Sequence, residues 1–167
     1  MREGSLKILY SGPEKLFNQV QPVLEALGDP VWLGNKHGTA FMADKVVYAQ
    51  FYGIHFTYML VAALGQAAGI SVENLKMLIG GGDRWKMRGQ MIDTALDMAS
   101  SRDYAGNECA LDVHLDAFKH AVQLSEDTDV GVEFMHMVAQ AMNEAIEKGH
   151  AKDELPSIFE ALCDNKT

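Results

Sequence analysis

The longest uncharged segment of this chain, residues 46–72, limits its possible folds more than any other feature. The segment contains no Asp, Glu, Lys or Arg and is long enough to cross a bilayer. Gln50, His55 and several glycines dilute its hydrophobicity, however, and neither flank carries the basic cluster that would orient a membrane helix. A helix that is apolar on nearly all sides is normally surrounded by protein. We therefore predict a long, buried central helix and no membrane partner.

Composition and charge describe one acidic globular protein. Of 167 residues, 48% are hydrophobic, which is enough for a packed core. The net charge of −9, from 14 basic and 23 acidic residues, argues against binding to nucleic acid, which requires a concentrated basic surface. The two cysteines, Cys109 and Cys163, form no CxxC motif, and the first residues have too short an apolar run for a signal peptide. These features favour the reducing cytoplasm.

The chain opens with a short α/β segment and continues with helices only. Residues 6–12 and 29–34 have strand character, and residues 13–28 between them have helical spacing interrupted by Pro22. No strand pattern follows Gly38. The predicted fold class is mainly α, with a central helix over about 38–69 preceded by a short β-α-β unit.

The remaining helices are predicted from their caps and apolar stripes. Ser71 and Asp83 are suitable N-caps on either side of a glycine run, and Asp153 is the expected cap of a last helix with Pro156 in its first turn. The polar residues 100–108 resemble a linker. Two stripes are expected to form the core: Leu111, Leu115, Phe118 and Val122, and Val130, Phe134, Val138, Ala141 and Ala145.

Searches for catalytic motifs are mostly negative. The sequence lacks GxGxxG, GxxxxGK[ST], HExxH and GxSxG, the local signatures of dinucleotide binding, nucleotide binding, zinc proteases and serine hydrolases. The six histidines are dispersed, and His114 and His120 do not have the spacing of two metal ligands on one helical face. We therefore expect no metal site.

One stripe on the central helix does suggest a site. Asp44, Tyr48, Phe51, Tyr52 and His55 share one helical face, so an acid would lie beside aromatic side chains. This arrangement is typical of a pocket wall with a polar tip. It is equally compatible with a carboxylate that simply favours the positive end of the helix dipole.

Lys45 follows the acid directly, about 100° farther around the helix axis. Adjacent residues on a helix do not face each other, so Lys45 need not pair with Asp44.

The order of several segments resembles a known family. "ILYSGPEKLFNQVQPVLEALG", "VWLG", "GTAFMADKVVYAQFYG" and the stretch that ends in "KGHAKDELPSIFEAL" are similar to the carboxyl-terminal part of NADPH-dependent imine reductases. These belong to the wider β-hydroxyacid dehydrogenase, or 6-phosphogluconate dehydrogenase-like, superfamily. The resemblance implies that residues 1–34 end a Rossmann-type cofactor domain. Residues 35–167 would then be a helical substrate and dimerisation domain, entered by the interdomain helix and exchanging helices in a homodimer.

The resemblance also implies roles for individual residues. Asp44 occupies the position where hydroxyacid dehydrogenases carry a catalytic lysine, and imine reductases often have an aspartate or tyrosine there. Reading Lys45 as that lysine would require an insertion and would rotate it off the pocket face. Imine chemistry is therefore preferred over carbonyl reduction. Tyr52 resembles a substrate-lining position, and the weaker candidates for substrate contact are Tyr48, Phe51, Trp85 and His114.

A carboxyl group near an imine nitrogen can donate a proton to it or, when ionised, stabilise an iminium cation. Burial against Tyr48 and Tyr52 would tend to raise the pKa of Asp44, whereas a bound iminium would favour its charged form. The residues leave both roles open.

Most of a Rossmann domain, including its glycine-rich turn, is not in this sequence. We therefore expect NADPH as the cofactor of a complete enzyme and no cofactor binding by this chain alone. The chain is expected to be the substrate-side half of an imine reductase, either truncated or completed by a separate Rossmann half. The alternatives are a carbonyl-reducing enzyme and a non-catalytic helical dimerisation module.

Overall fold

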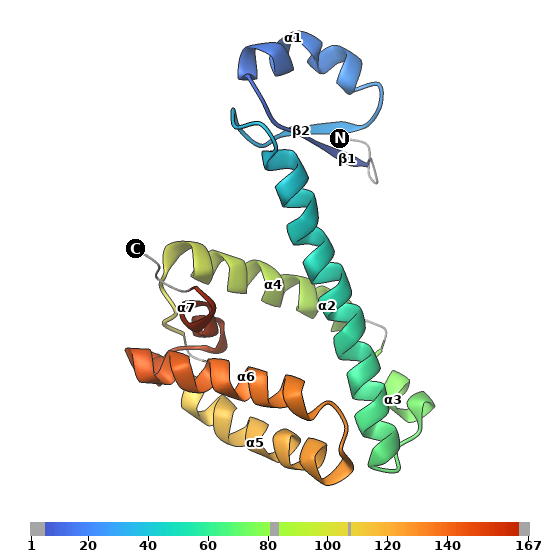
Figure 1. Ribbon diagram of the computed structural model, residues 1–167, viewed down its shortest axis with the longest axis vertical. Coiled ribbons are helices and arrows are strands. Elements are labelled where there is room, and N and C mark those ends of the chain that lie inside the picture. Colours follow the sequence, from blue (N-terminus) through green and yellow to red (C-terminus); the bar gives the residue numbers. More distant parts are fainter. Residues whose placement is uncertain (1–5, 81–83, 107, 164–167) are drawn as a thin grey trace. The chain divides into compact units, whose positions relative to one another are not determined.

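The structure is a computed structural model that describes residues 6–80, 84–106 and 108–163, with the backbone alone for residues 84–88 (Figure 1). The described residues are mostly helical and contain two strands, which pair in parallel. This confirms the mainly α fold class. The chain divides into two compact units, residues 1–58 and 59–167, and the long central helix passes from one to the other. The functional boundary after residue 34 stays a prediction.

The first unit begins with the predicted β-α-β segment. It consists of strand β1 (Lys7–Tyr10), helix α1 (Glu14–Leu24) and strand β2 (Asp29–Trp32). The two strands run parallel, with Lys7 opposite Asp29 and Tyr10 opposite Trp32. Pro22 lies two residues before the end of α1, so its missing N–H affects only the last turn of the helix.

Aromatic contacts hold α1 on one face of these strands. The Phe17 ring lies 6.0 Å from the Tyr10 ring and 6.5 Å from the Trp32 ring, measured between centroids. The indole Nε1 of Trp32 donates a hydrogen bond of 3.0 Å to the carbonyl oxygen of Gly12. A further hydrogen bond joins the end of β1 to the central helix, because the backbone N–H of Ala40 donates to Ser11 Oγ at 3.1 Å. The first turn of the central helix is thereby fixed to the β-α-β segment.

The central helix α2 (Thr39–Ala67) forms as predicted, but its predicted burial is wrong for the single chain. Its only buried residues are Leu60 and Gly65. In the described part of the chain, α2 is also the one helix long and apolar enough to cross a membrane, judged by length and composition. Its exposed large apolar residues are Phe41, Met42, Val46, Val47, Tyr48, Phe51, Tyr52, Ile54, Phe56 and Met59. The single chain thus leaves most of the apolar surface of this helix uncovered.

The second unit is a helical domain. Its helices are α3 (Val72–Ile79), α4 (Arg84–Ser101), α5 (Leu111–Thr128) and α6 (Val132–Ala145), followed by a π-helical turn (Ile146–His150), a 3₁₀ turn (Leu155–Ile158) and α7 (Phe159–Leu162). Helices α5 and α6 lie side by side (Figure 1). The predicted Ser71 cap is confirmed, because Ser71 Oγ accepts from the N–H of Asn74 at 3.2 Å. The cap predicted at Asp83 lies outside the described residues.

The core of the second unit forms between α5 and α6, where the two apolar stripes predict it. Leu111 and Leu115 from α5 are buried with Met142 and Ala145 from α6. Phe118 and Val138, one from each stripe, pack against this cluster.

Two glycines allow close packing around the second half of α2, within the second unit. A Cβ atom at Gly65 would lie 2.3 Å from Leu75 Cδ1, so the absence of a side chain lets α3 approach α2. Gly131, in the turn before α6, has a φ of +66°, and a Cβ atom there would lie 2.2 Å from Leu60 Cδ1. The turn between α5 and α6 is closed by Ser125, whose buried hydroxyl donates to the carbonyl oxygen of Val130 at 2.5 Å.

Two local predictions in this unit are wrong. Residues 100–108 are not a simple linker, because α4 continues to Ser101 and Tyr104 is buried, with 3% of its surface exposed. Glu154, rather than Asp153, occupies the N-cap of the 3₁₀ turn, and its side chain makes no capping bond. Asp153 is instead engaged by His150, three residues before it, whose Nδ1 lies 2.7 Å from Asp153 Oδ2.

Candidate functional site

Asp44 lies in the second turn of α2, close to the β-α-β segment. Its side chain is 49% exposed in the single chain, so it is neither sealed in the protein nor free on all sides. Lys45 Nζ donates to Asp44 Oδ2 at 3.0 Å. The two neighbours pair although adjacent positions on a helix do not face each other, because the long lysine stem bends back across the angle between them. An ion pair this exposed contributes only about 0–1 kcal/mol, so a ligand can replace it at little cost.

Lys45 also reaches the aromatic stripe. Its Nζ lies 4.7 Å from the centroid of the Phe41 ring and 4.9 Å from that of Tyr48. Both distances are within the range of cation–π contacts. The Lys45 ammonium thus reaches a ring of the aromatic stripe, although position 45 lies about 100° farther around the helix axis than Asp44. The side chains of Asp44, Lys45 and Tyr48 form one cluster in this structure.

The aromatic stripe continues along α2 as its spacing predicts. The rings of Tyr48 and Tyr52 are stacked with their centroids 6.3 Å apart, and the Phe51 ring meets the Tyr52 ring edge to face at a centroid distance of 5.5 Å. The centroid of the Phe51 ring also lies 4.3 Å from that of the His55 imidazole, and His55 Nδ1 donates to the Phe51 carbonyl oxygen at 2.8 Å. The result is a row of flat rings beside a carboxylate and an ammonium group. Such a row can hold a flat or cationic organic group by stacking.

The remaining predicted substrate residues belong to the second unit. His114 is half-buried in the first turn of α5, where its backbone N–H donates to the carbonyl oxygen of Ala110 at 3.0 Å. Trp85 lies in α4, and its side chain is outside the described residues. The structure thus brings together Asp44, Tyr48, Phe51 and Tyr52 on one helix, and the site roles of all six residues stay predictions.

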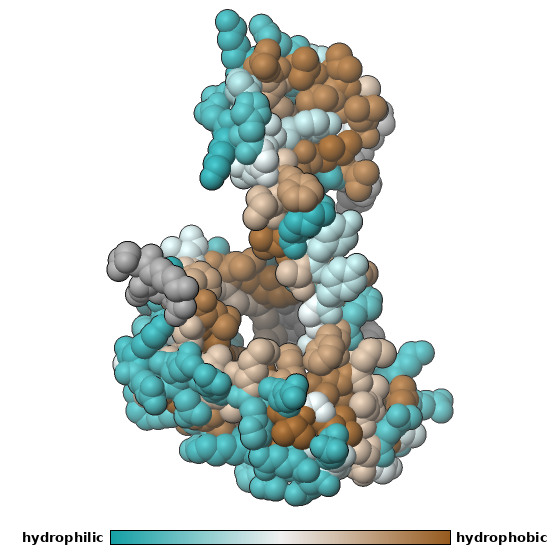
Figure 2. Space-filling view, viewed as in Figure 1, coloured by the Kyte–Doolittle hydropathy of each residue, from teal (hydrophilic) through white to brown (hydrophobic). Residues whose placement is uncertain are grey.

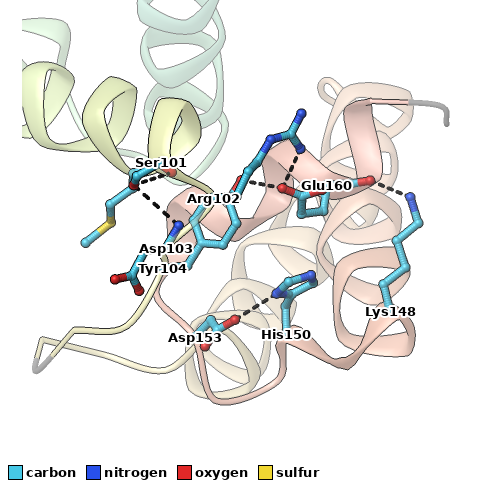
Figure 3. A network of polar contacts seen from close by, with 9 residues as sticks. Ser101, Arg102, Asp103, Tyr104, Lys148, His150, Asp153 and Glu160 are labelled. Carbon is cyan, nitrogen blue, oxygen red and sulfur yellow. Dashed lines mark hydrogen bonds and ion pairs between the residues drawn. The ribbon is translucent and has the colours of Figure 1, made fainter.

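A polar cluster that the sequence did not suggest joins the end of α4 to α7 (Figure 3). Glu160 Oε1 accepts from Arg102 Nη1 and from the Tyr104 hydroxyl, both at 2.5 Å. The Arg102 hydrogen bond, followed by that of Tyr104, holds the pKa of Glu160 below its usual value. Burial, assisted by the bond to Glu160, raises the pKa of Tyr104 to about 12. Around neutral pH, Glu160 therefore stays ionised and Tyr104 stays protonated, as expected of a structural cluster rather than a proton-transfer site. We call this cluster of Arg102, Tyr104 and Glu160 the clasp.

The clasp extends to the turn after α6. The His150 ring meets the Tyr104 ring edge to face at 5.7 Å, and Lys148 Nζ donates to the carbonyl oxygen of Glu160 (Figure 3). Gly149, between Lys148 and His150, has a φ of +102°, which favours glycine and directs these two side chains into the cluster. Fifty-six residues separate Tyr104 from Glu160, so no local sequence signal indicates the contact.

An open groove of about 560 Å³ runs along α5 and α6. Glu126 and His136 pair across it, with His136 Nε2 2.8 Å from Glu126 Oε1. Its described lining includes none of the residues predicted to bind substrate. Across residues 6–80, 84–106 and 108–163, no three His, Cys, Asp or Glu side chains converge as metal ligands would.

The start of α1 does not fit a dinucleotide. In a Rossmann domain the first N–H groups after a glycine-rich turn bind the pyrophosphate. Here Gly12 N donates to the Gly34 carbonyl oxygen and Glu14 N donates to Asn35 Oδ1, so both N–H groups are occupied. Glu14 also adds a negative charge in the first turn of the helix. The start of α1 therefore has no free N–H at Gly12 or Glu14 to offer a phosphate.

Comparison with known proteins decides the family. Residues 36–164 match the model of the NADPH-dependent reductive aminase-like family, C-terminal domain. This chain belongs to that family. The match begins just before α2 and covers both the aromatic stripe and the second unit.

The reductive aminase-like domain has relatives of known activity. The whole chain is 24% identical over 159 residues to the NADPH-dependent reductive aminase of Aspergillus oryzae, covering 92% of this chain and 52% of that protein. Its structure is similar to the imine reductase of Myxococcus stipitatus in complex with NADP+, at 24% identity and a TM-score of 0.80, covering 94% of this chain and 59% of the other. The reductive aminase of Aspergillus terreus in complex with NADPH and ethyl levulinate gives 22% identity and a TM-score of 0.76, covering 94% and 54%. The chain therefore spans about half the length of these proteins.

Proposed function

We propose that this chain is the substrate-side half of an NADPH-dependent reductase that acts on imines, and that it is inactive without a cofactor-binding half. The observation that supports this most directly is the Asp44 carboxylate beside the stacked Tyr48 and Tyr52 rings, within the segment that matches the reductive aminase-like family. NADPH would supply a hydride to the imine carbon. Everything else in the reaction falls to the residues of this chain and its partners.

The role of Asp44 is to control charge at the imine nitrogen. When protonated, it donates its proton to that nitrogen as hydride reaches carbon, so that C=N becomes CH–NH and the carboxylate remains. When ionised, it stabilises an iminium that is already protonated. A cationic substrate would take the place of the Lys45 ammonium, which now lies 3.0 Å from Asp44 Oδ2. The exposed Tyr48 and Tyr52 rings would then hold the substrate's apolar part.

The complete site requires more protein than one chain. Asp44 is half exposed and the aromatic stripe is largely uncovered, whereas catalytic electrostatics are strongest where water is excluded. We infer that a second copy covers α2 in a homodimer formed by interlocked helices. Trp85 and His114 would complete the substrate pocket, and the assembly would be cytoplasmic.

The test reconstitutes the enzyme from two parts. This chain is combined with the part of the Aspergillus oryzae reductive aminase that precedes the matched segment, and NADPH oxidation is followed with a cyclic imine. Asp44→Asn should lower the rate by about 10²–10⁴-fold, the usual contribution of general acid catalysis. Asp116→Asn is the matched control, because Asp116 is an exposed, lysine-paired carboxylate on α5, 2.7 Å from Lys119 Nζ. It should leave the rate unchanged.

Other outcomes favour the alternative functions. If the combined protein oxidises 3-hydroxy acids with NADP+ but does not reduce imines, the chain belongs to a carbonyl-reducing enzyme. If Asp44→Asn and Asp116→Asn behave alike while the chain still dimerises, it is a dimerisation module without catalytic chemistry.

A further inference from the structure

The candidate site on α2 carries two opposite charges, and the proposed reaction uses only one of them. Asp44 and Lys45 lie four and three residues before Tyr48, so helical spacing places both side chains one turn from the same ring. An imine with no other charged group offers the Lys45 ammonium nothing to bind. Folding stability does not explain the lysine either, because an exposed ion pair contributes little to it.

Two aromatic rings keep the Lys45 ammonium at the site. Its Nζ lies 4.7 Å from the centroid of the Phe41 ring, four residues before it, and 4.9 Å from that of Tyr48, three residues after it. Cation–π contacts on both sides favour the side-chain conformation in which the ammonium stays on this face of α2. A substrate that displaces Lys45 from Asp44 therefore still has the ammonium within reach.

Both charged groups have unused hydrogen-bonding capacity. In the described part of the chain, the Asp44 carboxylate and the Lys45 ammonium have only each other as hydrogen-bond partners, at 3.0 Å. A carboxylate accepts up to about four hydrogen bonds, and an ammonium group donates three. The two side chains are 49% and 48% exposed, so a ligand can approach both. Figure 2 shows hydrophilic side chains among hydrophobic ones along the visible face of α2.

A ligand that satisfies both groups carries a positive and a negative charge a few bonds apart. With its cation on Asp44 and its anion on Lys45, the four charges alternate in sign, so that neighbouring charges attract. A ligand with a cation alone would place a second positive charge beside Lys45, and one with an anion alone would place a second negative charge beside Asp44. The stacked rings of Tyr48 and Tyr52 lie next to this pair and offer a surface for the apolar part of the ligand.

We propose that Lys45 is a specificity-determining residue and that the substrate of this site is an imino acid, an imine with a carboxylate on its C=N carbon. This rests on the proposed function. The protonated nitrogen binds Asp44, and the substrate carboxylate binds Lys45. The C=N carbon accepts the hydride that NADPH supplies, and the π electron pair of C=N becomes the lone pair on nitrogen. The product is an amino acid, whose amine takes a proton from water.

The first experiment uses the reconstituted enzyme described above and two six-membered cyclic imines that differ only by a carboxylate on the C=N carbon. NADPH oxidation gives kcat and KM for each. Lys45→Met removes the charge and keeps an apolar stem, whereas Lys45→Arg keeps a positive charge. Lys119→Met is the matched control, because Lys119 is an exposed lysine on α5 with its Nζ 2.7 Å from Asp116 Oδ1. Circular dichroism shows whether each variant folds.

The wild type should prefer the imine with the carboxylate at least roughly tenfold in kcat/KM, as expected of a hydrogen bond between charged groups. With that imine, Lys45→Met should lose roughly 10- to 100-fold in kcat/KM, mainly through a higher KM. Lys45→Arg should recover most of the loss, and Lys119→Met should behave as the wild type. With the unsubstituted imine, Lys45→Met should stay within about twofold of the wild type or exceed it, since no contact with Lys45 is lost.

Three results would overturn the proposal. One is a wild type that reduces the two imines equally well or prefers the unsubstituted one. Another is a Lys45→Met variant that keeps the preference for the carboxylate. The third is a Lys45→Met variant that loses activity with both imines by the same factor, which would indicate that Lys45 supports the fold of the site.

The second experiment measures binding without the reaction. Because every residue of the proposed contact lies in this chain, the tyrosine NMR signals of the full chain are followed during titration with three six-membered rings. Pipecolate carries both charges, piperidine only a cation and cyclohexanecarboxylate only an anion. Pipecolate should bind at least roughly tenfold more tightly than the other two, and Lys45→Met should bring its affinity close to that of piperidine. Pipecolate that does not bind, or binds equally well to Lys45→Met, would contradict the proposal.

The failure of this proposal differs from that of the proposed function. Reduction of the unsubstituted imine that depends on Asp44, with no preference for the carboxylate, supports the function and contradicts the role of Lys45. Binding of pipecolate that depends on Lys45, with neither imine reduced, supports a site for both charges and contradicts the proposed reaction.

Discussion

The two compact units of this protein differ in how much of their apolar surface the single chain covers. The second unit has a closed core of Leu111, Leu115, Met142 and Ala145 and a clasp that pairs distant polar groups. The first unit has a two-stranded parallel sheet, an exposed apolar line on α1 and the largely uncovered first half of α2. The second unit therefore buries an apolar core of its own, whereas the first unit leaves much of its apolar surface exposed in the single chain.

The largest expected effect is on stability, and it compares a buried core residue of the second unit with an exposed residue of the first. Leu111→Ala should lower the free energy of unfolding of the second unit by about 2–5 kcal/mol, because Leu111 is fully buried and its removal leaves a cavity. Val46→Ala, on the exposed face of α2, should change the stability of the monomer by less than about 0.5 kcal/mol. Urea unfolding followed by circular dichroism measures both. Equal effects would contradict the difference between the units.

The next comparison concerns the exposed surface of α2. Val47→Glu should dissociate the proposed homodimer, because it would bury an unpaired carboxylate in an apolar interface. Val113→Glu is the control, since Val113 on α5 is exposed to nearly the same extent, 55% against 58%. Sedimentation velocity at micromolar concentration should show monomer for the first variant and dimer for the second. A wild-type chain that sediments as a monomer would remove the basis of the comparison.

The clasp of the second unit predicts a smaller effect. Tyr104→Phe should cost about 1 kcal/mol, because it removes one hydrogen bond while Arg102 continues to pair with Glu160. Thermal unfolding measures the loss. A Tm equal to that of the wild type would show that the Tyr104 hydroxyl contributes nothing.

The same clasp predicts how stability varies with pH. The pKa of Tyr104 is raised to about 12 by burial, so its contribution is present below the usual value of about 10 and is lost as pH rises from there to the folded value. The pKa of Glu160 is lowered, mainly by Arg102, so its contribution is present above the usual value and is lost as pH falls through the lower, folded value. Tyr104→Phe should remove the alkaline loss and keep much of the acid loss. Glu160→Gln should remove the acid loss.

The smallest effect is expected at the candidate site itself. Lys45→Met should change stability by about 0–1 kcal/mol, because its ion pair with Asp44 is half exposed. A larger loss would mean that Lys45 supports the fold of α2 rather than occupying a place that substrate can take.

Local patterns predicted the elements of both units well. The β-α-β segment, the length of α2 and the two core stripes follow from periodicities of two and 3.6 residues, which the backbone imposes over short distances. The Ser71 cap was predictable for the same reason, because the hydroxyl and the N–H that it binds are three residues apart.

Contacts made over long distances were not predictable in this way. The Tyr104–Glu160 bond depends on how α4 and α7 pack, so residues 100–108 resembled a linker. At the candidate site, the stripe on α2 followed from spacing, but the Asp44–Lys45 pair depends on a flexible side chain that crosses between adjacent positions. The exposure of α2 was not predictable either, because hydropathy tells how apolar a helix is and not which surfaces cover it.

The contact between Gly131 and Leu60 links two parts of the second unit that are distant in sequence. Any side chain at position 131 would meet two separate penalties, a left-handed backbone and a collision with the leucine. Shortening residue 60 would relieve only the collision. The two positions should therefore be energetically coupled. A mutation at 131 combined with Leu60→Ala should destabilise the protein less than the sum of the two single changes. Which residues are tolerated at either position therefore depends on the residue at the other.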